Sequence, residues 1–233
     1  SDLTTLGNLV SGETLNLSGT GTLASAAVGS DKSVSIGTLA LSDGSGESDN
    51  YTLSGGTLEL DVTTRNVTIS GAKSYDGNNI VSNSSISTFN NLVSGESLTI
   101  TGSGTISSGA VGSNKTISLG TLTLANGSGS ASNYNLSSGT VSVTRRVINL
   151  SGSKTYNGTT SITASDINTF GNIVTGETLS LSGTGSVSTS AAENNKTLTL
   201  GSIALSDGSG SVSNYTLSSG THQVNITRRS VDL

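Results

Sequence analysis

The chain has 233 residues, with no Cys, Met, Trp or Pro, 31 Gly, five Tyr and two Phe, and only 11% of its residues are charged. This composition is not typical of a cytosolic enzyme, and any core must be built from Leu, Val and Ile. The net charge of −5 argues against nucleic acid and against an anionic membrane surface, because both bind clusters of Lys and Arg.

Four segments near the start of the chain alternate aliphatic residues with Ser, Thr, Asn or charged residues, as half-buried β-strands do. In chain order they are residues 13–18 (ETLNLS), 32–36 (KSVSI), 57–63 (TLELDVT) and 66–70 (NVTIS). Clusters of Gly with Ser, Asp or Asn break such runs every eight to twelve residues or so, the spacing of turns between short strands. Short helical turns are predicted only at residues 85–89 and 166–170. We therefore predict an all-β chain.

Export is favoured by the absence of cysteine, which also excludes a disulfide framework and thiolate metal sites. No apolar run approaches the roughly 18 residues that span a bilayer, so we expect no membrane insertion in this segment. The start of the chain lacks the pattern of a signal peptide, and we expect any export signal to lie outside this piece.

Long sequence segments recur at a nearly fixed distance. VSGETLNLSGTGT at 10–22 returns as VSGESLTITGSGT at 93–105 and as VTGETLSLSGTGS at 174–186, which is 83 and then 81 residues further on. The Asn-Tyr pairs at 50–51, 133–134 and 214–215 keep the same offsets, as do the segments around Lys32, Lys115 and Lys196. Self-similarity at a fixed period is the sequence signature of repeat architectures.

This period predicts complete units at residues 65–145 and 146–228. An incomplete unit at 1–64 precedes them without the opening SGxKxYDG segment, and residues 229–233 begin a further unit. We name residues 1–64, 65–145 and 146–228 copy 1, copy 2 and copy 3. We expect a slice of a longer, elongated array of small β-sandwich-like modules, Ig-like or β-grasp-like.

A β-solenoid is the alternative architecture. The triplet Gly-Thr/Ser-aliphatic begins at residues 21, 37 and 56, and again at equivalent positions in each later copy, with His222 replacing the aliphatic residue in copy 3. The spacings of 16 and 19 residues differ, whereas stacked coils repeat evenly. The uneven spacing favours separate modules.

The sequence offers no set of residues for catalysis, and we predict no catalytic, cofactor-binding or metal-binding residue. His222 is the only histidine, so a catalytic triad or a histidine zinc site lacks a second partner. It stands, by sequence, where the earlier copies have Leu58 and Val141, which indicates a structural role. No Ser-Lys pair is distinguished from the others, and the Gly-rich strings lack the ending of a phosphate loop.

Three recurring polar features each have a structural and a functional interpretation. The strings at 42–49 and 206–210 contain Asp and turn carbonyls, which Ca²⁺ prefers, but copy 2 has Asn126 there and Asp or Asn before Gly is an ordinary turn choice. The recurring glutamates and lysines are interpreted as polar strand ends; ion pairs or Lys-Asn isopeptide cross-links are the alternatives. These residues are Glu13, Glu96, Glu177, Lys32, Lys115 and Lys196.

The opening segment AKSYDGNN at 72–79 returns as SKTYNGTT at 153–160. With the Gly-Glu turn and the closing Asn-Tyr-x-Leu, it resembles the YDG-type repeats of large bacterial exoproteins, which include filamentous-haemagglutinin-like and biofilm adhesins. Asn157 replaces the Asp of the second motif. This exchange suits a residue that shapes a turn, since Asp and Asn both cap turns and Gly supplies a positive φ. We expect Tyr75 and Tyr156 to bury their rings and keep their hydroxyls hydrogen-bonded.

The resemblance implies a secreted or surface-anchored bacterial protein. We expect a non-catalytic stalk that extends an adhesive region from the cell surface and contacts its neighbouring repeats. The alternative is a module that itself binds a glycan or a host or biofilm matrix protein. Carbohydrate contacts usually need aromatic platforms, and the few aromatic residues recur at framework positions, which favours the stalk.

Overall fold

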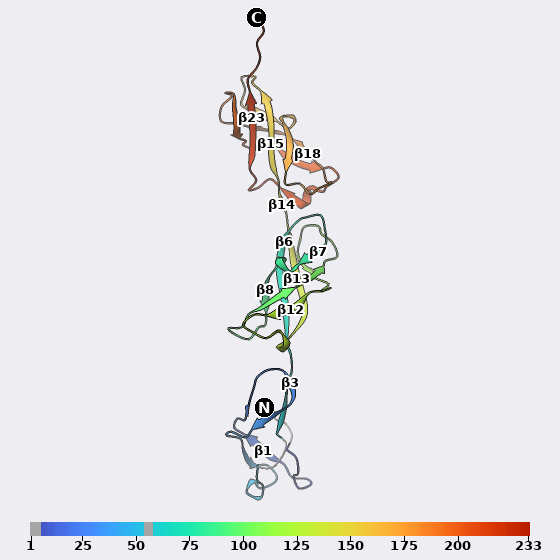
Figure 1. Ribbon diagram of the computed structural model, residues 1–233, viewed down its shortest axis with the longest axis vertical. Helices are drawn as coiled ribbons and strands as arrows, with labels where there is room; N and C mark the ends of the chain where they lie inside the picture. Colours follow the sequence, from blue (N-terminus) through green and yellow to red (C-terminus); the bar gives the residue numbers. More distant parts are fainter. Residues whose placement is uncertain (1–5, 54–57) are drawn as a thin grey trace. The chain divides into compact units, whose positions relative to one another are not determined.

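The computed structural model describes residues 6–53 and 58–233 and shows an all-β protein (Figure 1). The strands of these described residues form several small sheets, none of which closes into a barrel. Within the described residues the helical elements are five 3₁₀ turns of three residues each, and no helix there is long or apolar enough to cross a membrane. Gly56 and Thr57, which belong to the predicted strand 57–63 or to the triplet that begins at Gly56, lie outside the described residues.

The elements follow the repeat. Those of copy 1 are β1 (Leu15–Ser18), β2 (Thr22–Leu23), β3 (Gly29–Ser35), β4 (Ala40–Asp43), η1 (Ser48–Asn50) and β5 (Glu59–Val62). Those of copy 2 are β6 (Arg65–Ser74), β7 (Ile80–Ser82), η2 (Asn83–Ser85), β8 (Ile86–Asn90), β9 (Leu98–Thr101), β10 (Ser103–Thr105), β11 (Gly112–Thr116), β12 (Thr123–Asn126), η3 (Ala131–Asn133) and β13 (Tyr134–Thr144). Those of copy 3 are β14 (Arg146–Val147), β15 (Asn149–Thr155), β16 (Ser161–Thr163), η4 (Ala164–Asp166), β17 (Ile167–Gly171), β18 (Leu179–Ser182), β19 (Thr184–Ser186), β20 (Glu193–Thr197), β21 (Ala204–Asp207), η5 (Val212–Asn214), β22 (Tyr215–Thr216) and β23 (His222–Thr227).

The predicted strands appear as β1, β3, β5 and β6, and the prediction of helical turns at 85–89 and 166–170 is wrong in position. The 3₁₀ turns end at Ser85 and Asp166, and the following residues form β8 and β17. β8 contains Ile86, Thr88 and Phe89, and β-branched and aromatic residues suit a strand better than a helix. Sequence reasoning also missed the three 3₁₀ turns that end at the Asn of each Asn-Tyr pair.

Backbone contacts divide the chain into two compact units that do not coincide with the copies, so the predicted copy boundaries stay a prediction. The first unit comprises Ser1–Val67, Asn91–Thr99 and Leu124–Ser137, and the second comprises Thr68–Asn90, Ile100–Thr123 and Ser138–Leu233. In the first unit, β1 pairs antiparallel with β4, and β3 lies between β2 and β5.

In the second unit, copy 3 shows the complete arrangement of strands. A four-stranded sheet has the order β17-β15-β23-β20, in which β15 runs antiparallel to β17. It runs parallel to β23, as Figure 1 shows. Two antiparallel pairs, β16-β19 and β18-β21, accompany this sheet. The corresponding sheet of copy 2 has the order β8-β6-β13-β11.

The core of copy 3 is aliphatic, as the alternating pattern predicts. Ile148, Leu150 and Ile162 come from the opening segment, and Val224 and Ile226 come from β23; each is at most 2% exposed. Gly152 stands at a register shift beside η4, where a Cβ atom would overlap the carbonyl oxygen of Asp166. The close approach of two backbones explains why the opening motif SGxK requires its glycine.

Candidate functional site

Each copy contains one tyrosine-glutamate hydrogen bond, which joins two of the recurring sequence motifs. The tyrosine of the Asn-Tyr pair donates its hydroxyl proton to the glutamate of the Gly-Glu turn, 38 residues earlier. The O–O distance is 2.5 Å for Tyr51 and Glu13 and 2.6 Å for Tyr215 and Glu177, and Tyr134 bonds Glu96 in the same way. Each hydroxyl also accepts a backbone N–H at 3.1–3.2 Å, from Val10, Val93 and Val174.

The second glycine of each Gly-Ser-Gly string lies against this glutamate. A Cβ atom built on Gly46 would stand 2.6 Å from the nearer carboxylate oxygen of Glu13. Gly129 and Gly210 hold the same relation to the glutamates of copies 2 and 3. The glycine therefore leaves room for a carboxylate that reaches its tyrosine.

In the second compact unit, a second tyrosine joins the pair of copy 3. Tyr75, from the YDG motif of copy 2, donates its hydroxyl proton to Oε1 of Glu177 at 2.5 Å, while Tyr215 donates to Oε2. The two rings meet edge to face, with centroids 5.4 Å apart and an interplanar angle of 82°, an arrangement that the ring quadrupoles favour. Tyr75 is 7% exposed and Tyr215 is 2% exposed. One carboxylate thus receives two hydroxyl groups from successive copies.

The surroundings keep both phenols neutral. Burial raises the pKa of Tyr215 to about 12, with a further contribution from its hydrogen bond to Glu177. The hydrogen bond to Glu177 is also the main cause that raises the pKa of Tyr75, followed by burial. Ionising either phenol would place a second negative charge beside the carboxylate. Both hydroxyls are therefore fixed as donors at neutral pH.

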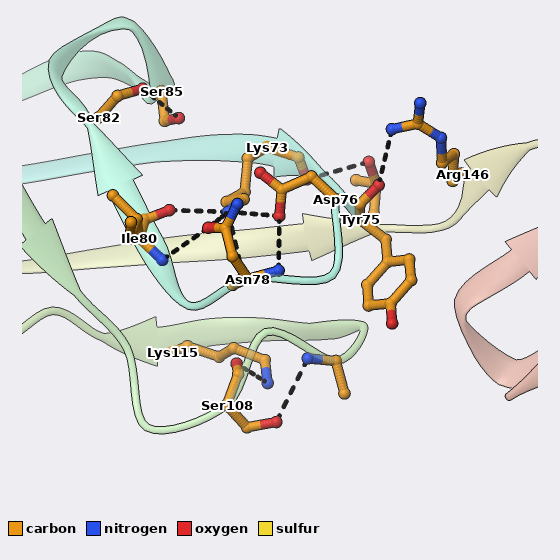
Figure 2. A network of polar contacts seen from close by, with 12 residues as sticks. Lys73, Tyr75, Asp76, Asn78, Ile80, Ser82, Ser85, Ser108, Lys115 and Arg146 are labelled. Atoms are coloured by element: carbon orange, nitrogen blue, oxygen red, sulfur yellow. Dashed lines mark hydrogen bonds and ion pairs between the residues drawn. The ribbon is translucent and has the colours of Figure 1, made fainter. Parts of the chain in front are cut away.

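The YDG turn itself is organised by a lysine and an Asp or Asn cap, as Figure 2 shows for copy 2. The Lys73 ammonium lies 2.8 Å from Oδ1 of Asp76 and donates to the carbonyl oxygen of Ile80 at 2.7 Å. The same Asp76 oxygen accepts the N–H of Asn78 at 3.2 Å, and Gly77 has a φ of 80°. The Tyr75 ring extends away from this turn (Figure 2).

In copy 3 the same turn forms without the carboxylate. Oδ1 of Asn157 accepts the N–H of Thr159 at 3.1 Å, and Gly158 has a φ of 80°. The buried Lys154 ammonium donates to the carbonyl oxygens of Thr159 and Ser161 at 3.0 and 2.6 Å. This confirms the predicted turn chemistry of Asp76 and Asn157. The predicted burial of both tyrosine rings is confirmed for Tyr75 and wrong for Tyr156, which is 41% exposed.

Further bonds surround Tyr75 in the second compact unit. Nη1 of Arg146 donates to the carbonyl oxygen of Tyr75 at 3.2 Å (Figure 2), and its Nη2 donates to Oδ1 of Asn172 at 2.9 Å. The backbone N–H of Val111 donates to Oδ1 of Asn214 at 2.9 Å. Copy 2 is thus bound to copy 3 by the Tyr75 side chain, by the backbone N–H of Val111 and by Arg146 at the start of copy 3. We call Tyr75, Arg146, Glu177, Asn214 and Tyr215 the junction cluster.

The recurring lysines do not meet the recurring glutamates. Lys32 donates to the carbonyl oxygen of Ala27 at 2.5 Å, Lys115 to that of Ser108 at 3.1 Å, and Lys196 to Glu193 at 2.8 Å. These bonds provide no support for a shared Glu-Lys pair or for an isopeptide cross-link at these lysines.

A lysine does meet an asparagine amide elsewhere, in the YDG turn of copy 2. The Lys73 ammonium donates to Oδ1 of Asn78 at 3.1 Å, as one of several hydrogen bonds that it makes. Thr159 takes the place of Asn78 in copy 3, where the lysine is bound in the same way. The contact is therefore a cap of the turn.

The strings considered for calcium form capped turns. Oδ1 of Asp43 accepts the N–H of Ser48 at 2.7 Å, Oδ1 of Asn126 accepts that of Ala131 at 2.8 Å, and Oδ1 of Asp207 accepts that of Val212 at 2.6 Å. Among the described residues, no three acidic or histidine side chains gather around a common point that could hold a metal ion. The turn interpretation therefore accounts for all three copies.

His222 is 8% exposed, and both of its ring nitrogens have partners in the fold. Nδ1 accepts the backbone N–H of Leu150 at 3.2 Å, and Nε2 lies 2.9 Å from the carbonyl oxygen of Leu217, to which it donates. Its backbone accepts the N–H of Leu198 as Gly139 accepts that of Ile117, so its counterpart in copy 2 is Gly139 and not Val141. The predicted match of His222 with Val141 is wrong because the spacing from the tyrosine of the Asn-Tyr pair to this position is two residues longer in copy 3 than in copy 2.

The sheets, the repeated tyrosine-glutamate bonds and the junction cluster define a tandem-repeat, all-β protein whose repeated polar residues serve its own fold. The chain belongs to the YDG domain family. The model of that family, described as YDG domain, matches residues 1–58, 60–143 and 142–222. No curated protein and no solved structure matches the chain.

Proposed function

We propose that the chain is a non-catalytic spacer from a bacterial surface protein of the adhesin type, located outside the cell, whose repeats hold an adhesive region away from the cell. The junction cluster carries this proposal. The most distinctive residue of the YDG motif, Tyr75, uses its ring and its hydroxyl on the next copy. A residue employed in this way couples successive modules and is withdrawn from contact with a ligand.

The recurring polar groups support the same reading. Each recurring glutamate accepts from a tyrosine. Each recurring lysine binds a nearby group of its own copy, which is a backbone carbonyl oxygen for Lys32 and Lys115 and the Glu193 carboxylate for Lys196. Among the described residues, no buried side-chain nitrogen or oxygen lacks a hydrogen-bond partner. Catalytic sites, in contrast, tend to keep polar groups free to meet a substrate.

Small-angle scattering on the chain, and on a variant in which residues 65–145 are duplicated, tests the proposal. A strand of 11 residues such as β13 spans about 36 Å, so three modules in a row would form a rod of about 110 Å with a radius of gyration of about 30 Å. A single globule of this length would have a radius of gyration of about 17 Å, which the duplication would raise only to about 20 Å. We expect the rod, whose radius of gyration should grow in proportion to the number of copies.

The alternative function is tested on the same samples. Titration with heparin and with fibronectin would detect a repeat that itself binds glycan or matrix protein. Saturable binding that disappears when the turn strings around Gly44, Gly127 and Gly208 are replaced would contradict a pure spacer.

A further inference from the structure

The sequence contains two Asn-Gly dipeptides, Asn126-Gly127 in copy 2 and Asn157-Gly158 in the opening turn of copy 3. In such a dipeptide the backbone nitrogen of the glycine can attack the side-chain carbon Cγ of the asparagine, because glycine has no side chain to obstruct the approach. The two dipeptides have the same local chemistry. The fold around each one therefore decides whether this attack is favoured.

The turn of copy 3 holds the Asn157 carboxamide beside the Gly158 nitrogen. Oδ1 of Asn157 accepts the N–H of Thr159 at 3.1 Å, so the side chain folds back over the peptide group that lies between them. The hydrogen bonds that the structure describes include none from the Gly158 N–H. They include none from the Gly77 N–H either, although Gly77 lies against Val174 of copy 3. An unengaged glycine nitrogen is thus a property of the turn.

Two donors meet the oxygen on which negative charge develops when the nitrogen attacks Cγ. Besides the N–H of Thr159, the Thr159 hydroxyl donates to Oδ1 of Asn157 at 3.0 Å. The buried Lys154 ammonium in turn donates to Oγ1 of Thr159 at 2.9 Å, which leaves the hydroxyl proton to Asn157. Donors that are fixed in advance at such an oxygen lower the barrier to attack on an acyl carbon.

The other dipeptide lacks both features. The N–H of Gly127 donates to the carbonyl oxygen of Gly129 at 3.2 Å, so its nitrogen is engaged. Oδ1 of Asn126 accepts the N–H of Ala131 at 2.8 Å, and this bond directs the carboxamide across the turn instead of over the next peptide group. The backbone is also closely packed, since a Cβ atom on Gly127 would stand 2.4 Å from the carbonyl oxygen of Ser97.

Copy 2 shows what an aspartate would do at the position of Asn157. There the Lys73 ammonium lies 2.8 Å from Oδ1 of Asp76 (Figure 2). The equivalent Lys154 is 7% exposed and donates to the hydroxyl and the carbonyl oxygen of Thr159 and to the carbonyl oxygen of Ser161, all of which are uncharged. A carboxylate beside this ammonium would offset part of the cost of its burial.

We propose that Asn157 is a site of spontaneous deamidation, which converts the Tyr-Asn-Gly motif of copy 3 into the Tyr-Asp-Gly motif of copy 2. The Gly158 nitrogen loses its proton and bonds to Cγ of Asn157, the bond from Cγ to Nδ2 breaks, and ammonia leaves with that proton. Water then adds to Cγ of the cyclic imide, and the bond from Cγ to the Gly158 nitrogen breaks. The product is an aspartate in an unaltered backbone, and its carboxylate pairs with Lys154.

Ageing of the full chain in mildly alkaline buffer, followed by protease digestion and mass spectrometry, tests the reaction. We expect Asn157 to be lost about tenfold faster than Asn126, because the Gly127 N–H must first leave its hydrogen bond. In urea the two sites should react at similar rates, since the difference comes from the fold. Loss of Asn157 no faster than that of Asn126 would overturn the proposal. So would an excess that persists in urea, because the flanking sequence would then set the rate.

Substitutions at Thr159 test the donors. Thr159→Val should slow the loss of Asn157 about fivefold, because one donor to the developing oxyanion is removed. Thr159→Ser keeps the hydroxyl and should retain the original rate, and neither substitution should change the loss of Asn126. An unchanged rate in Thr159→Val would contradict the role of the hydroxyl.

The identity of the product tests the pairing with Lys154. Fragmentation of the aged peptide distinguishes aspartate from isoaspartate, which arises when water opens the imide at the backbone carbonyl and the chain then runs through Cγ. We expect aspartate at position 157 in the aged chain. Asn157→Asp should raise the urea midpoint of the full chain, and the gain should vanish in a Lys154→Met background. Isoaspartate as the sole product, or a midpoint that does not rise, would refute the pairing.

Discussion

The substitution Tyr75→Phe removes one hydroxyl from the junction cluster and leaves the ring in place. Hydrogen bonds to charged groups contribute about 1.5–3 kcal/mol, and Tyr75 is too buried for water to replace the lost donor fully. Glu177 keeps its bond from Tyr215, and the edge-to-face contact of the rings survives. We therefore expect a loss at the lower end, about 1.5 kcal/mol, which raises the unfolding constant roughly tenfold.

The chain supplies its own control for this measurement. Tyr156 occupies the same place in copy 3, and the structure describes no hydrogen bond from its exposed hydroxyl. Tyr156→Phe should change the free energy of unfolding by less than about 0.5 kcal/mol. Urea unfolding followed by far-ultraviolet circular dichroism on the full chain gives both values. Equal effects of the two substitutions would refute the junction cluster as a source of stability.

A double-mutant cycle separates the hydroxyl-carboxylate bond from indirect effects. Glu177→Gln keeps the shape of the side chain and removes its charge, so the second loss from Tyr75→Phe should be smaller in that background. Additive losses would show that the Tyr75 hydroxyl stabilises the chain independently of the Glu177 carboxylate.

Three further predictions concern single groups. The pKa of Tyr215 is about 12 in the folded chain, against an ordinary value of 10, so the contribution of this phenol to stability should be complete below pH 10 and lost as the pH rises through 12. Urea titrations at several alkaline pH values should show this fall in the free energy of unfolding, and Tyr215→Phe should make the fall smaller. Gly77→Ala and Gly158→Ala both place alanine at a φ of 80°, but only the first meets a neighbour, Val174 Cγ1 at 2.8 Å, so it should lower the melting temperature further, and equal shifts would contradict the contact. Lys154→Met should cost about 2 kcal/mol in urea unfolding, because the carbonyl oxygens that the ammonium caps lose their donor; an unchanged midpoint would show that water replaces it.

The repeat, the all-β class and the turn chemistry could be predicted from the sequence, because each rests on local pattern. Alternation of aliphatic and polar residues predicts strands. The presence of Asp76 in one copy and Asn157 at the equivalent position of the next indicates that this side chain caps a turn. The positions of the 3₁₀ turns could not be predicted, since Ser and Asn residues at 83–85 serve a turn or a strand end equally well.

The partners of the polar residues depend on tertiary pairing and were missed. The recurring glutamates meet tyrosines, 38 residues away, rather than the recurring lysines. The constant separation of Glu13 from Tyr51 and of Glu177 from Tyr215 was the available signal. The link from Tyr75 to Glu177 had no local signal, because it depends on how one copy meets the next.

The parallel pairing of β15 with β23 has a mechanical consequence. β15 lies near the start of copy 3 and β23 lies at its end, and the two strands run side by side in the same direction, from Leu150 beside His222 to Thr155 beside Thr227. A tensile load applied to the two ends would slide these strands past each other, so that all the rungs between them share the force at once instead of opening one by one. Rupture under load is governed by the unfolding rate. A tether built from such modules would yield in separate steps, and each step would lengthen the chain before the next module gives way.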